Sequence, residues 1–177
     1  MPLVLNGATS GSTTIQATDA VTATLTLPSS TGTLLSTANP QSGGVIQAVS
    51  VTSNISVSTS SSSFVTTGIT ASISPKFSTS KILVIVSLPV DTNASSCQNS
   101  LTIYRNSTNL GAGLNNNALS LSYNTGGRQI SGSSITYLDS PATTSSTTYT
   151  VYFASINTGT VNITGSGSTI TLMEIAA

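Results

Sequence analysis

The chain has 177 residues and a formal net charge of zero, because four Lys and Arg residues balance four Asp and Glu residues. Charged residues make up 5% of the chain, whereas an ordinary soluble domain has roughly 25%. Ser and Thr fill 65 of the 177 positions, so hydroxyl groups do most of the solvation that charges usually do. There is no His and one Cys, which excludes a Ser-His-Asp triad, a His-ligated zinc and a thiolate cluster. The composition indicates a structural or adhesive role rather than catalysis.

The composition also limits the partners. Four cations cannot neutralise the roughly six to ten phosphates of a duplex-binding surface, so we expect no nucleic-acid partner. No stretch approaches the roughly 18 consecutive apolar residues of a membrane span, and none is expected. The beginning, MPLVLNGATSGS, lacks the basic and long apolar regions of a secretory signal peptide.

Taken in chain order, almost the whole sequence alternates with period two, which is typical of strands with one buried face. The expected fold class is all-β: an N-terminal β arm over residues 1–42, a linker at 43–44, and an antiparallel β-sandwich or jelly roll over 45–177. The arm has few large apolar side chains, so we expect it to need a partner surface. Within the arm, residues 23–37 are predicted to form a hairpin.

The second region is predicted to contain up to ten short strands separated by Gly, Pro and Asn turns. Regularly spaced short strands of this kind indicate a sandwich or jelly roll. The predicted strands cover residues 45–51, 55–58, 64–73, 81–90, 99–106, 118–123, 130–138, 148–156, 160–164 and 169–175.

Two of these strands are apolar on both faces, at 82–86 (ILVIV) and at 151–154 (VYFA). Antiparallel sheets commonly have one wet face, so the second apolar face is either covered by another element or lies at a subunit interface. Because the sequence offers no spare helix, we favour an interface within a closed ring of identical subunits. The residues assigned to this oligomer interface are Ile82, Val84, Val86, Val151 and Phe153.

Local patterns that mimic catalytic or metal sites have simpler explanations. Ser78 to Lys81 match the S-x-x-K pattern of serine acyl-enzymes, but the match runs into a predicted strand. Asp91 begins a run similar to a calcium loop that lacks the required Gly and the final Glu. The carboxylates lie far apart in the sequence, so no catalytic pair is predicted. We therefore expect no catalytic residue, no metal site and no cofactor.

Three further residues carry individual predictions. Arg105 follows the inward alternation of its strand, so it lies at an exposed strand end, pairs with Asp91 or Asp139, or lines a subunit interface. Asp139 in the YLDSP corner is expected to cap its turn. Cys97 is expected to be a small loop residue.

Several stretches resemble small tail-fibre-type virion proteins of tailed bacteriophages. They are TTIQATDAVTATLTLPSSTGTLLST, SKILVIVSLPV, SLTIYRNSTNLG, ITYLDSPATTSSTTYTVYFASINTGTVNI and STITLMEIAA, which together span most of the chain. Such proteins resemble tumour-necrosis-factor-like jelly rolls that form trimers. The resemblance implies a homotrimer in the virion, with residues 1–42 attached to other phage tail or virion proteins and the globule facing outward.

Host recognition would use polar loops with an aromatic or arginine side chain. The residues that best meet this description are Asn115, Asn116, Asn117, Tyr123, Asn124 and Arg128, although a solvated hairpin tip is the simpler explanation for them. The leading hypothesis is a non-enzymatic virion structural protein whose globule serves assembly or binds a host-surface glycan or protein through multivalency. The alternatives are a capsid-surface decoration protein and a bacterial extracellular β-sandwich adhesin module.

Overall fold

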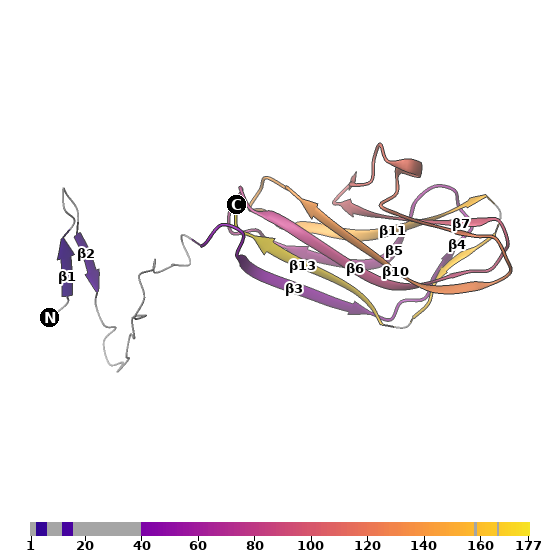
Figure 1. Ribbon diagram of the computed structural model, residues 1–177, viewed down its shortest axis with the longest axis horizontal. Coiled ribbons are helices and arrows are strands. Elements are labelled where there is room, and N and C mark those ends of the chain that lie inside the picture. The colour runs from indigo at the N-terminus through magenta and orange to yellow at the C-terminus, as the bar shows by residue number, and fades with distance from the viewer. Residues whose placement is uncertain (1–2, 7–11, 16–39, 158, 166) are drawn as a thin grey trace. The chain divides into compact units, whose positions relative to one another are not determined.

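The computed structural model describes residues 3–6, 12–15, 40–157, 159–165 and 167–177. The chain divides into two compact units, Met1–Leu35 and Ser36–Ala177. In the first unit, β1 (Leu3–Asn6) pairs antiparallel with β2 (Ser12–Ile15) (Figure 1). The hairpin predicted over residues 23–37 lies outside the described residues.

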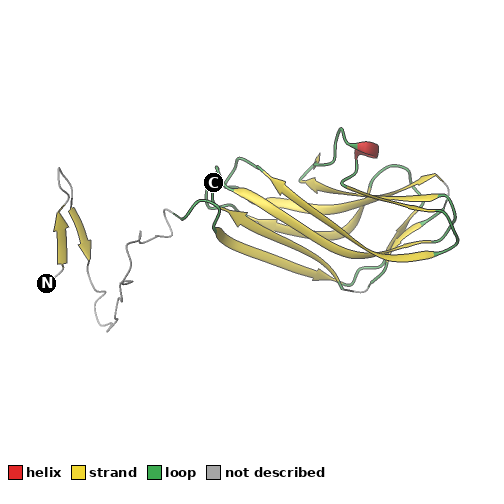
Figure 2. Ribbon diagram, viewed as in Figure 1, coloured by secondary structure: helices red, strands yellow, loops and turns green. Residues whose placement is uncertain are grey.

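The second unit contains two antiparallel sheets (Figure 2). The six-stranded sheet consists of β3 (Val45–Ser53), β4 (Val57–Thr59), β6 (Lys81–Thr92), β10 (Gln129–Asp139), β12 (Val161–Ile163) and β13 (Ser168–Ile175). The five-stranded sheet consists of β5 (Val65–Ile73), β7 (Cys97–Arg105), β8 (Thr108–Asn109), β9 (Ser120–Asn124) and β11 (Thr147–Asn157). One turn of 3-10 helix, η1 (Asn115–Asn117), follows β8. The described residues include no helix long and apolar enough to cross a membrane.

Strand β6 is central in the six-stranded sheet. Strand β10 pairs with one side of it, β13 and then β12 pair with the other side, and β3 and β4 lie beyond these two. In the five-stranded sheet the order is β5-β11-β7, and β8 and β9 both pair with the far side of β7. The long strands alternate between the sheets along the chain, as in jelly rolls. The prediction of an all-β antiparallel sandwich is confirmed, and all ten predicted strands of this unit occur near their predicted positions.

The hydrophobic core lies between the two sheets. Each long strand sends alternate side chains inward, and β13 shows this clearly, with buried and half-buried residues in strict alternation. The largest of the fully buried side chains include Tyr149, Phe153, Leu101 and Leu172. Full burial of one such apolar side chain stabilises the fold by about 1.5–3 kcal/mol.

The interface prediction needs a correction, because its five residues lie in this core. Ile82, Val84, Val86, Val151 and Phe153 are each 0% exposed within a single chain. They therefore stabilise the sandwich itself and offer no surface to a second copy. The outward face of β6 instead carries Leu83 and Ile85, which are half-buried.

The residues predicted as a linker are bonded to the sandwich. The N–H of Gly43 donates to the carbonyl of Ala176 at 2.8 Å, and the N–H of Ala176 donates to the carbonyl of Gly44 at 2.9 Å. Gly43 has a φ of +80°, a backbone conformation that glycine adopts at little cost. These bonds fix the entry of the chain into the sandwich beside its last strand.

Candidate interaction surfaces

A buried carboxylate joins the two sheets. Asp139, the last residue of β10, accepts hydrogen bonds from Arg105 Nη1 at 2.8 and 3.1 Å and from Tyr149 Oη at 2.7 Å. Burial, followed by the hydrogen bond to Asp139 and the charge of that carboxylate, raises the pKa of Tyr149 above its usual range, so its hydroxyl stays a donor. The pairing of Arg105 with Asp139 was one of the three explanations left open, and the structure confirms it. Asp139 acts across the sandwich instead of capping its turn.

A second buried carboxylate, Glu174 of β13, anchors the segment between β5 and β6. It accepts hydrogen bonds from Gln47 Nε2 at 2.6 Å and from the backbone N–H groups of Lys76 and Phe77 at 2.8 and 3.2 Å. Burial by itself raises the pKa of Glu174, but the hydrogen bonds outweigh it and the pKa lies below its usual value. Sequence reasoning missed this residue, although its even spacing from Leu172 indicates an inward position.

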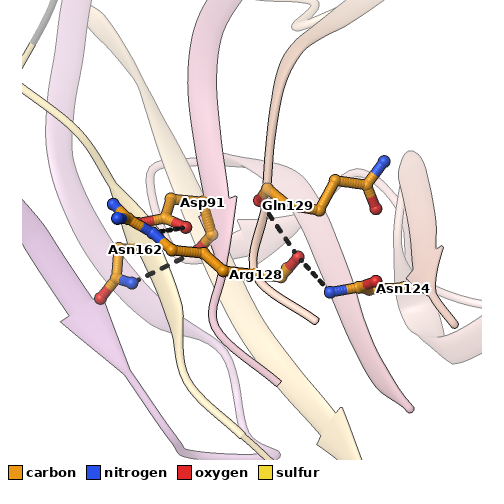
Figure 3. A network of polar contacts seen from close by, with 6 residues as sticks. Asp91, Asn124, Arg128, Gln129 and Asn162 are labelled. Atoms are coloured by element: carbon orange, nitrogen blue, oxygen red, sulfur yellow. Dashed lines mark hydrogen bonds and ion pairs between the residues drawn. The ribbon is translucent and has the colours of Figure 1, made fainter. Parts of the chain in front are cut away.

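The third carboxylate, Asp91, lies on the outward face of β6. Arg128 donates to it from Nε at 3.0 and 3.1 Å and from Nη2 at 2.8 Å. Asn162 of the neighbouring β12 donates to the backbone carbonyl of Asp91 at 3.4 Å, and Figure 3 shows the three residues together. The hydrogen bonds from Arg128 lower the pKa of Asp91 against the opposing effect of burial. Arg128, one of the predicted receptor residues, is thus already paired with a carboxylate of its own chain.

Asn124 holds the loop between β9 and β10 closed, although it was predicted to contact a receptor. Its side chain is buried, and its Nδ2 donates to Thr92 Oγ1 at 3.3 Å, to Ala94 O at 3.0 Å and to Gly127 O. Its Oδ1 accepts from the N–H of Gly126 at 2.9 Å. In Figure 3 a dashed line marks the hydrogen bond that Asn124 donates. The residue therefore shapes the loop and does not face a ligand.

The other predicted receptor residues are exposed, but they are not gathered in one place. Asn115, Asn116 and Asn117 form the η1 turn, and Tyr123, 53% exposed, lies on β9 of the five-stranded sheet. Arg128 is engaged on the six-stranded sheet. The exposed residues of this predicted set thus lie at separate places on the surface and do not line one receptor pocket.

The loop that carries η1 is held in place by Asn109. Its Oδ1 accepts from Thr102 Oγ1 at 2.6 Å and from the N–H of Gly111 at 2.9 Å, and its Nδ2 donates to Asn117 O at 2.9 Å. Gly111 is required here, because a Cβ would come within 2.7 Å of Thr102 Oγ1 and 2.8 Å of Asn117 O. The asparagines of η1 are therefore presented on a shaped loop.

A shallow open hollow of about 280 Å³ lies over β4 and β12, lined by Ser56, Val57, Ser58, Asn162, Ile163 and Thr164. Cys97 lies buried in β7 rather than in a loop, with Sγ 3.4 Å from Ser155 Oγ. Among the described residues, no group of three His, Cys, Asp or Glu side chains is placed to hold a metal ion.

Comparisons with known proteins give little further information. No protein-family model matches the chain, and no curated protein matches it. A mutant VP2 protein of infectious bursal disease virus in derived T=1 particles is similar with a TM-score of 0.40 and 13% identity, over 97% of this chain and 44% of that chain. The VP2 subviral particle of the same virus is similar with a TM-score of 0.38 and 12% identity, over 74% of this chain and 38% of that chain. The chain thus spans less than half of either structure, and at these scores the likeness assigns neither a family nor a function.

Proposed function

We propose that the chain is a non-enzymatic structural protein of a bacteriophage virion, located on the tail or particle surface as a short tail fibre or as a tail or baseplate accessory. The resemblance of its sequence to small tail-fibre-type proteins supports this proposal, as does its division into two compact units. A capsid-surface decoration protein and a bacterial extracellular adhesin module are the alternatives.

The observation that carries the proposal is the use of the carboxylates in the sandwich. Asp91, Asp139 and Glu174 each accept at least three hydrogen bonds that hold strands or loops together. Such bonds favour the ionised form, as the lowered pKa values of Asp91 and Glu174 indicate, and they suit a structural role for these carboxylates. Apart from Lys76, Lys81 and Arg128, the described surface consists mainly of hydroxyls, amides and apolar side chains, which suit association with proteins and neutral glycans.

In this proposal residues 1–42 attach the chain to other virion proteins, and the sandwiches associate as a homotrimer that faces outward. The exposed Tyr123 and the η1 asparagines would contact a host-surface glycan or protein. Several weak contacts per particle would then give useful avidity.

Electron microscopy with an antibody against residues 40–177 tests the proposal. Gold label on intact phage particles is the expected result. Label on the surface of uninfected bacteria, with none on particles, would favour the adhesin alternative and overturn the virion role. A chain that lacks residues 1–42, supplied during infection beside the full chain, should be missing from purified particles by mass spectrometry.

A further inference from the structure

The outward face of the six-stranded sheet carries an apolar row. The strand register places Leu138 of β10 opposite Leu83 of β6, Leu83 opposite Met173 of β13, and Met173 opposite Ala48 of β3. These four positions follow the outward alternation of their strands, which lie next to one another in this order (Figure 1). Four apolar side chains thus cross the whole width of the sheet on its solvent side.

The neighbouring rows extend this patch. Ile85 lies between Thr136 and Thr171 in the next row, and Ile175 lies between Lys81 and Val45 in the row on the other side. Leu138 is 50% exposed and Val45 is 58% exposed, so these side chains face solvent within the single chain. A hydrophobic patch of this kind on an otherwise polar protein marks a contact surface.

Charge on this face is confined to its two ends. Lys81 is at one end, and Asp91 at the other end is already neutralised by Arg128. Two identical faces of this kind would meet without like-charge repulsion, and the zero net charge of the chain removes repulsion at longer range. A charged partner would find no complementary group between the two ends.

The size of the face also indicates its partner. Strands lie about 4.8 Å apart, and alternate residues lie about 6.7 Å apart along a strand. Four strand widths over the rows from Lys81 to Asp91, where β12 and β4 continue the sheet beyond β13 and β3, cover a flat area of about 630 Å². The apolar side chains occupy the part of this area around Leu83, and the whole face is of the order of the roughly 800 Å² per partner that a stable interface buries. An extended peptide would cover about one strand width, whereas a second copy brings a face of matching size and charge.

We propose that the face formed by Leu83, Ile85, Leu138, Met173 and Val45 packs against a second copy of this chain. This inference rests on the proposed structural role and adds to it: two like faces join chains in pairs, so this contact is separate from the one that would close a homotrimer. It also answers the problem posed by the doubly apolar strand: one face of β6 builds the core and the other meets a neighbouring copy.

Photo-cross-linking of the full chain tests the inference. The variant Leu138→Cys is labelled with a cysteine-reactive benzophenone, and the buried Cys97 stays unlabelled. Illumination should yield a product of twice the chain mass. The matched control is Thr70→Cys on the outward face of the five-stranded sheet, where the label should give at least tenfold less of this product. Equal yields from both positions, or no cross-linked product from position 138, would overturn the inference.

A second substitution checks that the apolar row itself is responsible. Adding Leu83→Asp to the Leu138→Cys variant should lower the cross-linked fraction at least tenfold, and the milder Leu83→Thr should lower it severalfold while keeping a strand-forming side chain. An unchanged yield in a folded Leu83→Thr variant would contradict the assignment. If the chain is found in particles but does not cross-link at position 138, the proposed function stands and this inference fails. If the chain cross-links at position 138 but is absent from particles, this inference stands and the proposed function fails.

Discussion

Each of the three described carboxylates is held by a different set of donors. Asp139 is paired with Arg105 and Tyr149, Asp91 with Arg128, and Glu174 with an amide side chain and two backbone N–H groups. Removing one partner of a buried carboxylate leaves it poorly compensated, which costs more than the net contribution of the contact. Single substitutions at these residues are therefore informative.

The hydrogen bond between Tyr149 and Asp139 should stabilise the fold. Tyr149→Phe removes the donor hydroxyl and keeps the buried ring, so the free energy of unfolding should fall by about 1.5–3 kcal/mol, as for hydrogen bonds to charged groups. Urea denaturation measures this loss. Tyr123→Phe, at an exposed ring, is the control and should change stability by less than about 0.5 kcal/mol. Equal losses in the two variants would refute the stabilising role of the contact.

The second prediction concerns pH and Glu174. Its pKa is lowered in the folded state from an ordinary value of 4.5, so its stabilising effect is complete above that value and is lost as the pH falls through the folded-state pKa. The free energy of unfolding should therefore decrease as the pH falls below about 4.5. Asp91 has a shift of the same sign and contributes to the same decrease.

Urea titrations at a series of pH values from neutral to acidic, on the wild type and on Glu174→Gln, check this prediction. The variant cannot ionise at this position, so it should be less stable at pH 7 and lose less stability on acidification. The stability of the variant should still decrease somewhat on acidification, because Asp91 is still present. Parallel curves for the two proteins would show that Glu174 does not contribute.

The two faces of strand β6 differ in how deeply their side chains are buried. Val84 is 0% exposed in the core, whereas Ile85 lies half-buried on the outward face. Val84→Asp should destabilise the fold by more than about 4 kcal/mol, because it buries an unpaired carboxylate. Ile85→Asp should cost less than about 1.5 kcal/mol and should mainly weaken association. Thermal unfolding of both variants tests the difference, and similar losses in stability would contradict the assignment of the faces.

The elements were predictable from sequence because their signals are local. Alternation and turn residues located ten of the eleven strands of the sandwich, and the eleventh, β8, is two residues long and gave no such signal. The orientation of β6 was not predictable, since a strand that is apolar on both faces loses the contrast that separates inside from outside. The same holds for β11, where Phe153 points into the core and Tyr152 points outward to stack on Tyr104 with ring centroids 4.0 Å apart.

The polar contacts depended on which strands meet. The alternation of its strand left Arg105 with three explanations, one of them a pairing with Asp91 or Asp139, and the sequence did not choose between them. Tyr149 could not be linked to Asp139 from the sequence, since β10 and β11 belong to different sheets and only their packing brings the two side chains together. The buried Glu174 followed the inward pattern, but its donors come from the distant segment at residues 76–77.

In the sandwich as a whole, most of the few charges are paired within the chain, and Lys76 and Lys81 remain exposed. Both described arginines are paired with carboxylates of their own chain. In the proposed assembly, association would rely on apolar burial through the outward face of β3, β13, β6 and β10, with hydrogen bonds from Ser and Thr around it.

This dependence on apolar burial gives a prediction for the effect of salt. Ion pairs between exposed charges weaken as the Debye length shrinks from about 10 Å at 0.1 M salt to about 3 Å at 1 M. Apolar contacts do not weaken in this way, and sulfate strengthens them because it is excluded from protein surfaces. The dissociation constant of the assembly, measured by sedimentation velocity over a dilution series, should therefore change little between these NaCl concentrations and should fall in ammonium sulfate. An assembly that weakened tenfold in NaCl would instead be held by ion pairs, with Lys76 and Lys81 as the exposed lysines of the sandwich from which to start the search.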